Sequence, residues 1–286
     1  LHADLAKYLQ AKKIMETNVF AFEDSILGPE FAVRVYKSMM MLTERAWGGV
    51  LPKNEDAYAR QRVIYNPVTI DSFAKHRISK EERESRRAAL GILKDDIVCT
   101  RVGRDDVVKW GDLLLLSIPI LSGLAPQVKW LLRTVPKSRM EWLKKKGYLG
   151  SKVIVLPETS DEKEIAATYQ MADIYTHTTR RGEAFGNTLN EAMVWGLPIV
   201  AENTPHWDNG QVEQVLHKKT GLLVNSLPAF CGAVADLAAH ADMRRDYGLS
   251  GQKHVESFAL KHGIFQYALT YKFLYGSVRA EEYVRQ

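Results

Sequence analysis

The chain has 286 residues, of which 46% are hydrophobic and 26% charged, and its formal net charge is +5. This length supports one large or two modest domains with a sizeable core, and the composition excludes a disordered or fibrous chain. The charge is mild and mixed in sign along the chain, so it suits an anionic substrate or an acidic membrane surface and gives no indication of nucleic acid.

Cysteine usage and hydropathy restrict the compartment. The chain has two cysteines, Cys99 and Cys231, with no CxxC and no Cys/His cluster, which favours a reducing compartment and argues against structural zinc. No apolar run approaches the length of a membrane-spanning helix, and we recognise no signal peptide. We therefore expect a cytoplasmic protein, with the inner membrane surface as a further expected location. Because Leu1 stands where Met is usual, we also expect a fragment or a partly recorded chain.

The first ninety residues have an irregular pattern. Residues 30–47 predict a helix with Met39, Met40 and Met41 on its core face, and residues 62–65 predict a strand. A capped helix is predicted to open at Ser79, with Glu82 completing the cap, and Gly91 is predicted to end it.

From about residue 97, short apolar runs alternate with helical periodicity. Strands are predicted at residues 97–102, 128–133, 153–156, 173–178 and 198–202, and helices at residues 113–124, 138–146 and 161–172. This alternation is typical of βαβ units and predicts an α/β, Rossmann-like domain with a parallel sheet. Ligands of such sheets bind at the carboxyl ends of the strands, where Arg104 and the loops at 180–186 and 203–211 would emerge.

The most informative stretch runs from Glu183 to Glu191. Gly186 permits close approach of the backbone to a ligand, Asn187 is a competent N-cap, and the first N–H groups of the helix, including that of Thr188, carry its positive end. This combination predicts an anion site, with the two carboxylates flanking the helix start and able to accept hydrogen bonds from sugar hydroxyls. The alternative is an ordinary exposed glutamate pair on a well-capped helix.

This stretch resembles the Glu-x7-Glu motif of family 4 of the retaining glycosyltransferases, which have the GT-B fold of two facing Rossmann-like domains. The run from Gly103 through Arg104 to Lys109 resembles the Gly-Arg-x4-Lys donor-phosphate loop of that family. Residues 63–68 resemble the segment that closes its first domain, so the match spans roughly residues 63 to 225. The alternative for Arg104 and Lys109 is a solvated loop in which Asp105 and Asp106 pair with them.

The resemblance implies a domain organisation. Residues 1–92 would be a partial N-terminal acceptor-side domain, without the family's early glycine-rich loop. Residues 93–260 would be the donor domain, which binds the nucleotide sugar, and residues 261–286 a C-terminal helix that crosses back to the first domain. The family's histidine position compares with residues 15–20, which contain no histidine, so no catalytic histidine is carried over.

The resemblance also implies chemistry. Arg104 and Lys109, with the helix start at Gly186, Asn187 and Thr188, would bind the donor diphosphate, and Glu191 would bind the ribose. Glu183 would face the donor sugar, so Glu183, Arg104 and Lys109 are the expected catalytic residues. The chain contains no Asp-x-Asp pair, and we expect no metal and no cofactor besides the nucleotide-diphosphate sugar.

The expected activity is therefore retaining, metal-independent transfer of a sugar to a hydroxyl. The acceptor would be a glycan, a glycolipid or another hydroxyl compound, with peripheral membrane contact as a further expectation. The competing hypothesis is a nucleotide-sugar-binding module without transfer activity. Nucleic acid is not expected as a partner, because the chain has no basic stripe interleaved with aromatic residues. We interpret His177, near the predicted site, as a structural imidazole.

Overall fold

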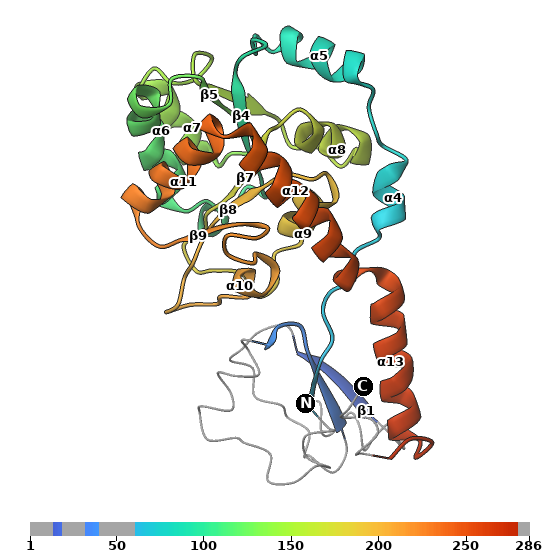
Figure 1. Ribbon diagram of the computed structural model, residues 1–286. Helices are drawn as coiled ribbons and strands as arrows, with labels where there is room; N and C mark the ends of the chain where they lie inside the picture. Colours follow the sequence, from blue (N-terminus) through green and yellow to red (C-terminus); the bar gives the residue numbers. More distant parts are fainter. Residues whose placement is uncertain (1–13, 19–31, 40–60, 280–286) are drawn as a thin grey trace. The chain divides into compact units, whose positions relative to one another are not determined.

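The computed structural model describes residues 14–18, 32–39 and 61–279 (Figure 1). The chain divides into two compact units, one formed by Leu1–Pro67 with Phe258–Gln286 and the other by Val68–Ser257. Within the described residues, no helix has the length and apolar composition needed to cross a bilayer.

The second unit is built on a six-stranded parallel sheet, which confirms the predicted α/β class. Its strands are β4 (Ile97–Val102), β5 (Val128–Arg133), β6 (Val153–Leu156), β7 (Ile174–His177), β8 (Ile199–Glu202) and β9 (Gly221–Val224). They are ordered β6-β5-β4-β7-β8-β9, and every neighbouring pair is parallel. Parallel neighbours need crossover connections, and the intervening segments of this unit supply helices.

The helices of this unit precede, connect and follow the strands of the sheet. They are α4 (Ile70–Ala74), α5 (Lys80–Ala89), α6 (Asp112–Leu124), α7 (Lys137–Lys145), α8 (Glu162–Gln170), α9 (Asn187–Val194), α10 (Gln211–Gln214), α11 (Leu227–Ala239) and α12 (Ala241–Val255), with a short 3-10 turn, η1, at Val107–Lys109. As predicted, the Ser79 hydroxyl accepts from the backbone N–H of Glu82 at the start of α5. Gly91 follows the end of α5 with a φ of 71°, a conformation that favours glycine.

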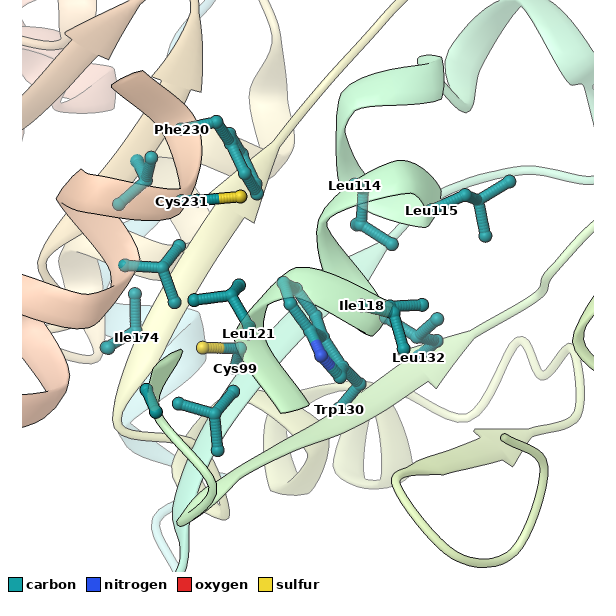
Figure 2. Close-up of a cluster of buried hydrophobic side chains, with 14 of the residues drawn as sticks. Cys99, Leu114, Leu115, Ile118, Leu121, Trp130, Leu132, Ile174, Phe230 and Cys231 are labelled. Atoms are coloured by element: carbon teal, nitrogen blue, oxygen red, sulfur yellow. The ribbon is translucent and has the colours of Figure 1, made fainter. Parts of the chain in front are cut away.

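The core lies where α6 and α11 pack against the sheet (Figures 1 and 2). Ile118 and Leu121 of α6 lie beside Trp130 of β5 in Figure 2, and all three side chains are buried. Cys99 and Cys231 are both free thiols that are buried in this core. Burial raises the pKa of the Cys231 thiol, so it behaves as a small apolar side chain.

The order of the strands positions the functional edge. From β4 the chain moves outward through β5 to β6, then returns to the other side of β4 with β7 and continues to β8 and β9. The direction of the connections therefore reverses between β4 and β7. In open parallel sheets this switch point separates two neighbouring loops at the carboxyl edge and leaves room for a ligand.

The first unit contains a three-stranded parallel sheet with the order β1-β2-β3. Its strands are β1 (Ile14–Asn18), β2 (Ala32–Tyr36) and β3 (Gln61–Val63). The helix α13 (Leu260–Leu274) belongs to the same unit. There, Lys37 Nζ donates a 2.6 Å hydrogen bond to the Tyr267 hydroxyl, and the Tyr65 and Phe258 rings meet edge to face with centroids 5.2 Å apart.

The helix predicted over residues 30–47 was wrong at residues 32–36. Ala32–Tyr36 forms β2, which pairs with β1 on one side and β3 on the other. Two parallel partners satisfy its backbone groups, and β-branched residues such as Val35 suit a strand. Met39 is 54% exposed, so it does not contribute to a core stripe, while Met40, Met41 and the remainder of the predicted helix lie outside the described residues.

Candidate functional site at the sheet switch point

The loops after β4 and β7 are joined by backbone hydrogen bonds at the switch point. The N–H of Arg180 donates to the carbonyl of Val108 at 2.9 Å, and the Thr179 hydroxyl donates to the same carbonyl at 3.1 Å. The N–H of Gly111 donates to the carbonyl of Thr178 at 3.3 Å. These bonds fix the Gly-Arg-x4-Lys loop against the loop that carries the first acid.

Two side-chain hydrogen bonds within the β4–α6 loop help to hold its shape. The carboxylate of Asp106 accepts from the N–H of Val108 at 2.9 Å and caps η1, and the indole of Trp110 donates to the carbonyl of Arg104 at 3.0 Å. Asp106 is therefore the cap of η1, and Lys109 forms its ion pair with Glu183 and not with Asp106. The Arg104 guanidinium is exposed and, within the described residues, takes part in no ion pair within 4.0 Å.

The helix α9 begins one residue earlier than predicted. Its N-cap is Gly186, with φ 82° and ψ 65°, and Asn187 is its first helical residue, so the prediction of Asn187 as N-cap was wrong. A side chain at Gly186 would be strained by the left-handed backbone and would meet Leu189 Cδ1 at 3.0 Å. No side chain of the described residues caps this start, so the N–H groups of Asn187 and Thr188 remain available to an anion.

Glu183, in the loop after β7, pairs with Lys109, in the loop after β4. Its Oε2 accepts a 2.6 Å hydrogen bond from Lys109 Nζ, and the two side chains are only 12% and 26% exposed. The backbone of Glu183 is also fixed, because its N–H donates to Gln211 Oε1 at 3.2 Å and its carbonyl accepts from the N–H of Gly210 at 2.8 Å. The predicted residues Lys109, Glu183 and Gly186 therefore lie at one place, and a Cβ built at Gly186 would lie 3.6 Å from Glu183 Cβ.

His177 ends β7 beneath this pair and is completely buried. Its Nε2 lies 3.6 Å from Glu183 Oε1. Burial, together with the positive charges of Arg101 and Lys109, holds the pKa of His177 well below its usual range. The imidazole is therefore neutral at physiological pH, and its contact with Glu183 is not an ion pair.

Glu191, the second acid, is held by an aromatic hydroxyl. The Tyr169 hydroxyl, from α8, donates to Glu191 Oε2 at 2.6 Å. Burial raises the pKa of Glu191, and the hydrogen bond from Tyr169 opposes that rise. Burial and the nearby Glu191 raise the pKa of Tyr169 well above its usual range, so the phenol stays protonated and remains a donor.

The loop after β8 closes the edge through Gln211. The amide of this buried residue donates to the carbonyl of Glu202 at 2.9 Å and to Thr204 Oγ1 at 2.7 Å, while its oxygen accepts from Glu183. A Cβ at Gly182 would lie 1.3 Å from the carbonyl oxygen of Asp208, so only glycine permits this approach of the loops. The loops after β4, β7 and β8 thus meet as one connected edge.

Sequence reasoning missed Tyr169 and Arg101, and it placed Gln211, whose partner Glu183 lies 28 residues away, only within the loop at 203–211. Tyr169 carries no local signal, because its partner Glu191 lies 22 residues away. Arg101 did carry one, since it is a charged residue inside the otherwise uncharged strand at residues 97–102. A guanidinium in a central strand must find buried partners or a ligand.

The strand order and this edge define the class of Rossmann-like α/β proteins, which bind their ligands at the switch point. The chain belongs to the family described as "Glycosyl transferases group 1", whose model matches residues 96–240. Its fold is of the GT-B type found in glycosyltransferase structures. The matched residues include the whole switch-point edge.

Two curated relatives are similar to part of the chain. The D-inositol 3-phosphate glycosyltransferase of Rhodococcus erythropolis is 26% identical over 193 residues, which is 63% of this chain and 42% of the relative. Spore coat protein SA of Bacillus subtilis is 22% identical over 213 residues, 70% of this chain and 55% of the relative. The chain thus spans about half the length of these relatives.

Solved structures resemble the fold at low identity. A glycosyltransferase from Rickettsia africae matches with a TM-score of 0.78 and 17% identity, over 96% of this chain and 74% of that one. Anabaena HepE, in complex with UDP and glucose, matches with a TM-score of 0.76 and 19% identity, over 95% and 75% of the two chains. At this identity the likeness extends to the fold alone.

Proposed function

We propose that this chain transfers a sugar from a nucleotide-diphosphate sugar to an acceptor hydroxyl, with retention of configuration and without a metal ion. One observation carries the proposal: the Lys109–Glu183 pair joins the switch-point loops beside the uncapped start of α9. A cation and free N–H groups suit a diphosphate, and a carboxylate beside them suits sugar hydroxyls.

In this proposal the leaving diphosphate is stabilised by charge and by backbone dipoles. Lys109 supplies an anchored cation, Arg104 an exposed one, and the N–H groups of Asn187 and Thr188 the positive end of α9. Together these groups would take the place of a divalent metal ion. The absence of an Asp-x-Asp pair from the sequence supports the same proposal.

The two acids are proposed to bind different parts of the donor. Glu191 would accept hydrogen bonds from the ribose hydroxyls, with Tyr169 holding one of its oxygens and leaving the other for the ligand. Glu183 would accept from the hydroxyls of the donor sugar while it retains Lys109 as its partner. Both roles use the carboxyl oxygens as acceptors, and ionisation makes each group acceptor-only.

Retention is proposed to follow from attack on the face that the diphosphate leaves. The acceptor oxygen would bond to the anomeric carbon as the bond from that carbon to the phosphate oxygen breaks, and the hydroxyl proton would pass to the departing phosphate. The structure of HepE was solved with UDP and glucose, and the Rhodococcus relative is named for an inositol phosphate. Both support a nucleotide-sugar donor and a hydroxyl-bearing acceptor such as a glycan or glycolipid.

Donor turnover with and without acceptors tests the proposal. The chain is incubated with UDP-, GDP- and ADP-sugars, alone and with sugar, inositol phosphate or glycolipid acceptors, and release of nucleoside diphosphate is measured. We expect release from one donor that an acceptor accelerates, with a glycoside product of the donor's anomeric configuration. Tight donor binding with no release under any condition would favour a binding module, and no binding of any donor would contradict both hypotheses.

A further inference from the structure

Arg101 is a buried cation on the central strand of the sheet. It follows Thr100 in β4, and its side chain is only 1% exposed. A guanidinium so placed has lost its hydration and needs either a counter-charge or a complete set of acceptors.

The acceptors around Arg101 are all uncharged. Nη1 donates to the Val102 carbonyl at 2.7 Å, to the Tyr175 hydroxyl at 2.8 Å and more weakly to Thr188 Oγ1 at 3.4 Å. Nη2 donates to the carbonyl of Lys109 at 2.9 Å. Nε of Arg101 is buried and has no hydrogen-bond partner among the described residues. Within the same residues, Arg101 forms no ion pair within 4.0 Å.

The position of Arg101 connects this charge, which lies over the Trp110 ring at 5.9 Å and pairs with no carboxylate of the described residues, with the proposed donor site. One nitrogen holds the end of the Gly-Arg-x4-Lys loop at Lys109, and the other reaches Thr188 in the first turn of α9. These are the two sides of the anion edge. A buried charge also acts strongly over short distances, because little water screens it.

We infer that Arg101 is a positioning residue for the diphosphate of the donor, whose negative charge compensates the buried guanidinium. The inference rests on the proposed function. Arg101 would not touch the phosphates; it would hold Lys109 and Thr188 in place and add a positive potential beneath them. It would therefore set the preference of the site for a nucleoside diphosphate over the uncharged nucleoside.

The substitution Arg101→Met removes the positive charge and keeps a long side chain. Arg101→Lys keeps the charge but removes the planar guanidinium. Arg87 offers a matched control, because it is also buried but pairs with Asp173 and bonds to the carbonyl of Asp96, before β4 begins. Arg87→Met also removes a buried guanidinium without touching Lys109 or α9. Circular dichroism and thermal melting identify the folded variants.

The measurement is calorimetric titration with the nucleoside diphosphate that the unmodified chain binds best among UDP, GDP and ADP, and with its nucleoside. In Arg101→Met we expect diphosphate affinity to fall about tenfold or more while nucleoside affinity stays nearly constant. Arg101→Lys should restore most of the preference, and Arg87→Met should retain it. The effect should persist at high salt, since the charge is buried.

An unchanged diphosphate-to-nucleoside ratio in folded Arg101→Met would overturn the inference, as would an equal loss for both ligands. If Arg101→Met does not fold, Arg101→Lys decides: a folded protein that keeps the preference supports the charge role, and one that loses it overturns that role. If the unmodified chain binds no nucleoside diphosphate, the proposed function itself fails, and the inference fails with it.

Discussion

Lys109 Nζ lies 2.6 Å from Glu183 Oε2, so the cation of one switch-point loop is neutralised by the acid of the next. The two residues are 74 positions apart in the sequence and meet because β4 and β7 are neighbours. A diphosphate bound at this edge would contact Lys109 while Lys109 keeps its contact with Glu183. The donor sugar would contact Glu183 on the other side of the same pair. In the proposed function, the pair would therefore link binding of the leaving group to binding of the sugar.

Salt should affect the contributions of Lys109 and Arg104 to nucleoside-diphosphate affinity differently. We expect Lys109→Ala and Arg104→Ala each to weaken nucleoside-diphosphate binding, since each removes a charge-assisted contact that contributes about 1.5–3 kcal/mol. Arg104 is exposed, so its effect should shrink at high ionic strength, whereas Lys109 is mostly buried and its effect should persist. Titrations at low and high salt measure both. Unchanged affinity in both variants would contradict the assignment of the phosphate loop.

Tyr169→Phe tests whether the phenol holds the second acid in its binding state. Removal of the hydroxyl leaves Glu191 buried without its donor, so the pKa of Glu191 should rise further. Nucleotide affinity should fall, and the acid limb of its pH profile should move to higher pH. Calorimetry across a pH series measures the shift. A profile identical to that of the unmodified chain would exclude this role for Tyr169.

Glu191 should reduce the stability of the fold near neutral pH. Burial raises its folded pKa above the ordinary value of 4.5, so its contribution is most favourable below that value and is lost as pH rises through the folded pKa. Glu191→Gln should therefore be more stable than the unmodified chain at pH 7, with the difference shrinking as pH falls through the folded pKa and levelling off below 4.5. Urea unfolding at several pH values measures it. A variant that is less stable at pH 7 would refute the prediction.

Metal independence has a direct test in the transfer assay. Turnover should survive excess chelator, because Lys109, Arg104 and the start of α9 are proposed to stabilise the leaving diphosphate. The same reaction with added manganese or magnesium provides the comparison. Complete loss of turnover in chelator, with recovery on addition of manganese, would mean that a metal ion neutralises the diphosphate.

The sequence predicted those parts of the fold whose signals are local. The alternation of apolar runs and helical periodicity identified the parallel sheet from β4 to β8, and Gly186 with Asn187 identified the start of α9 to within one residue. The N-cap was misplaced by one residue because Asn187 has the better cap propensity, whereas Gly186 alone adopts the left-handed conformation of the turn.

The remaining features depend on contacts between distant segments. Residues 32–36 form a strand because two partner strands lie beside them, which the pattern within residues 30–47 does not reveal. Tyr169 meets Glu191, and Arg101 meets Lys109 and Thr188, only after the sheet has brought their elements together. Such partners follow from strand order and not from spacing along the chain.

A comparison of Glu183→Gln with Glu191→Gln tests whether the two acids bind different parts of the donor. Calorimetry with the nucleoside diphosphate is set beside kinetics with the complete donor. Glu191→Gln should lose nucleotide affinity, by about tenfold for each 1.4 kcal/mol removed, because its proposed partner is the ribose. Glu183→Gln should bind the nucleoside diphosphate almost normally and lose turnover, because its proposed partner is the sugar. If folded Glu183→Gln fails to bind the nucleotide while Glu191→Gln binds it unchanged, the two roles are reversed and the account is contradicted.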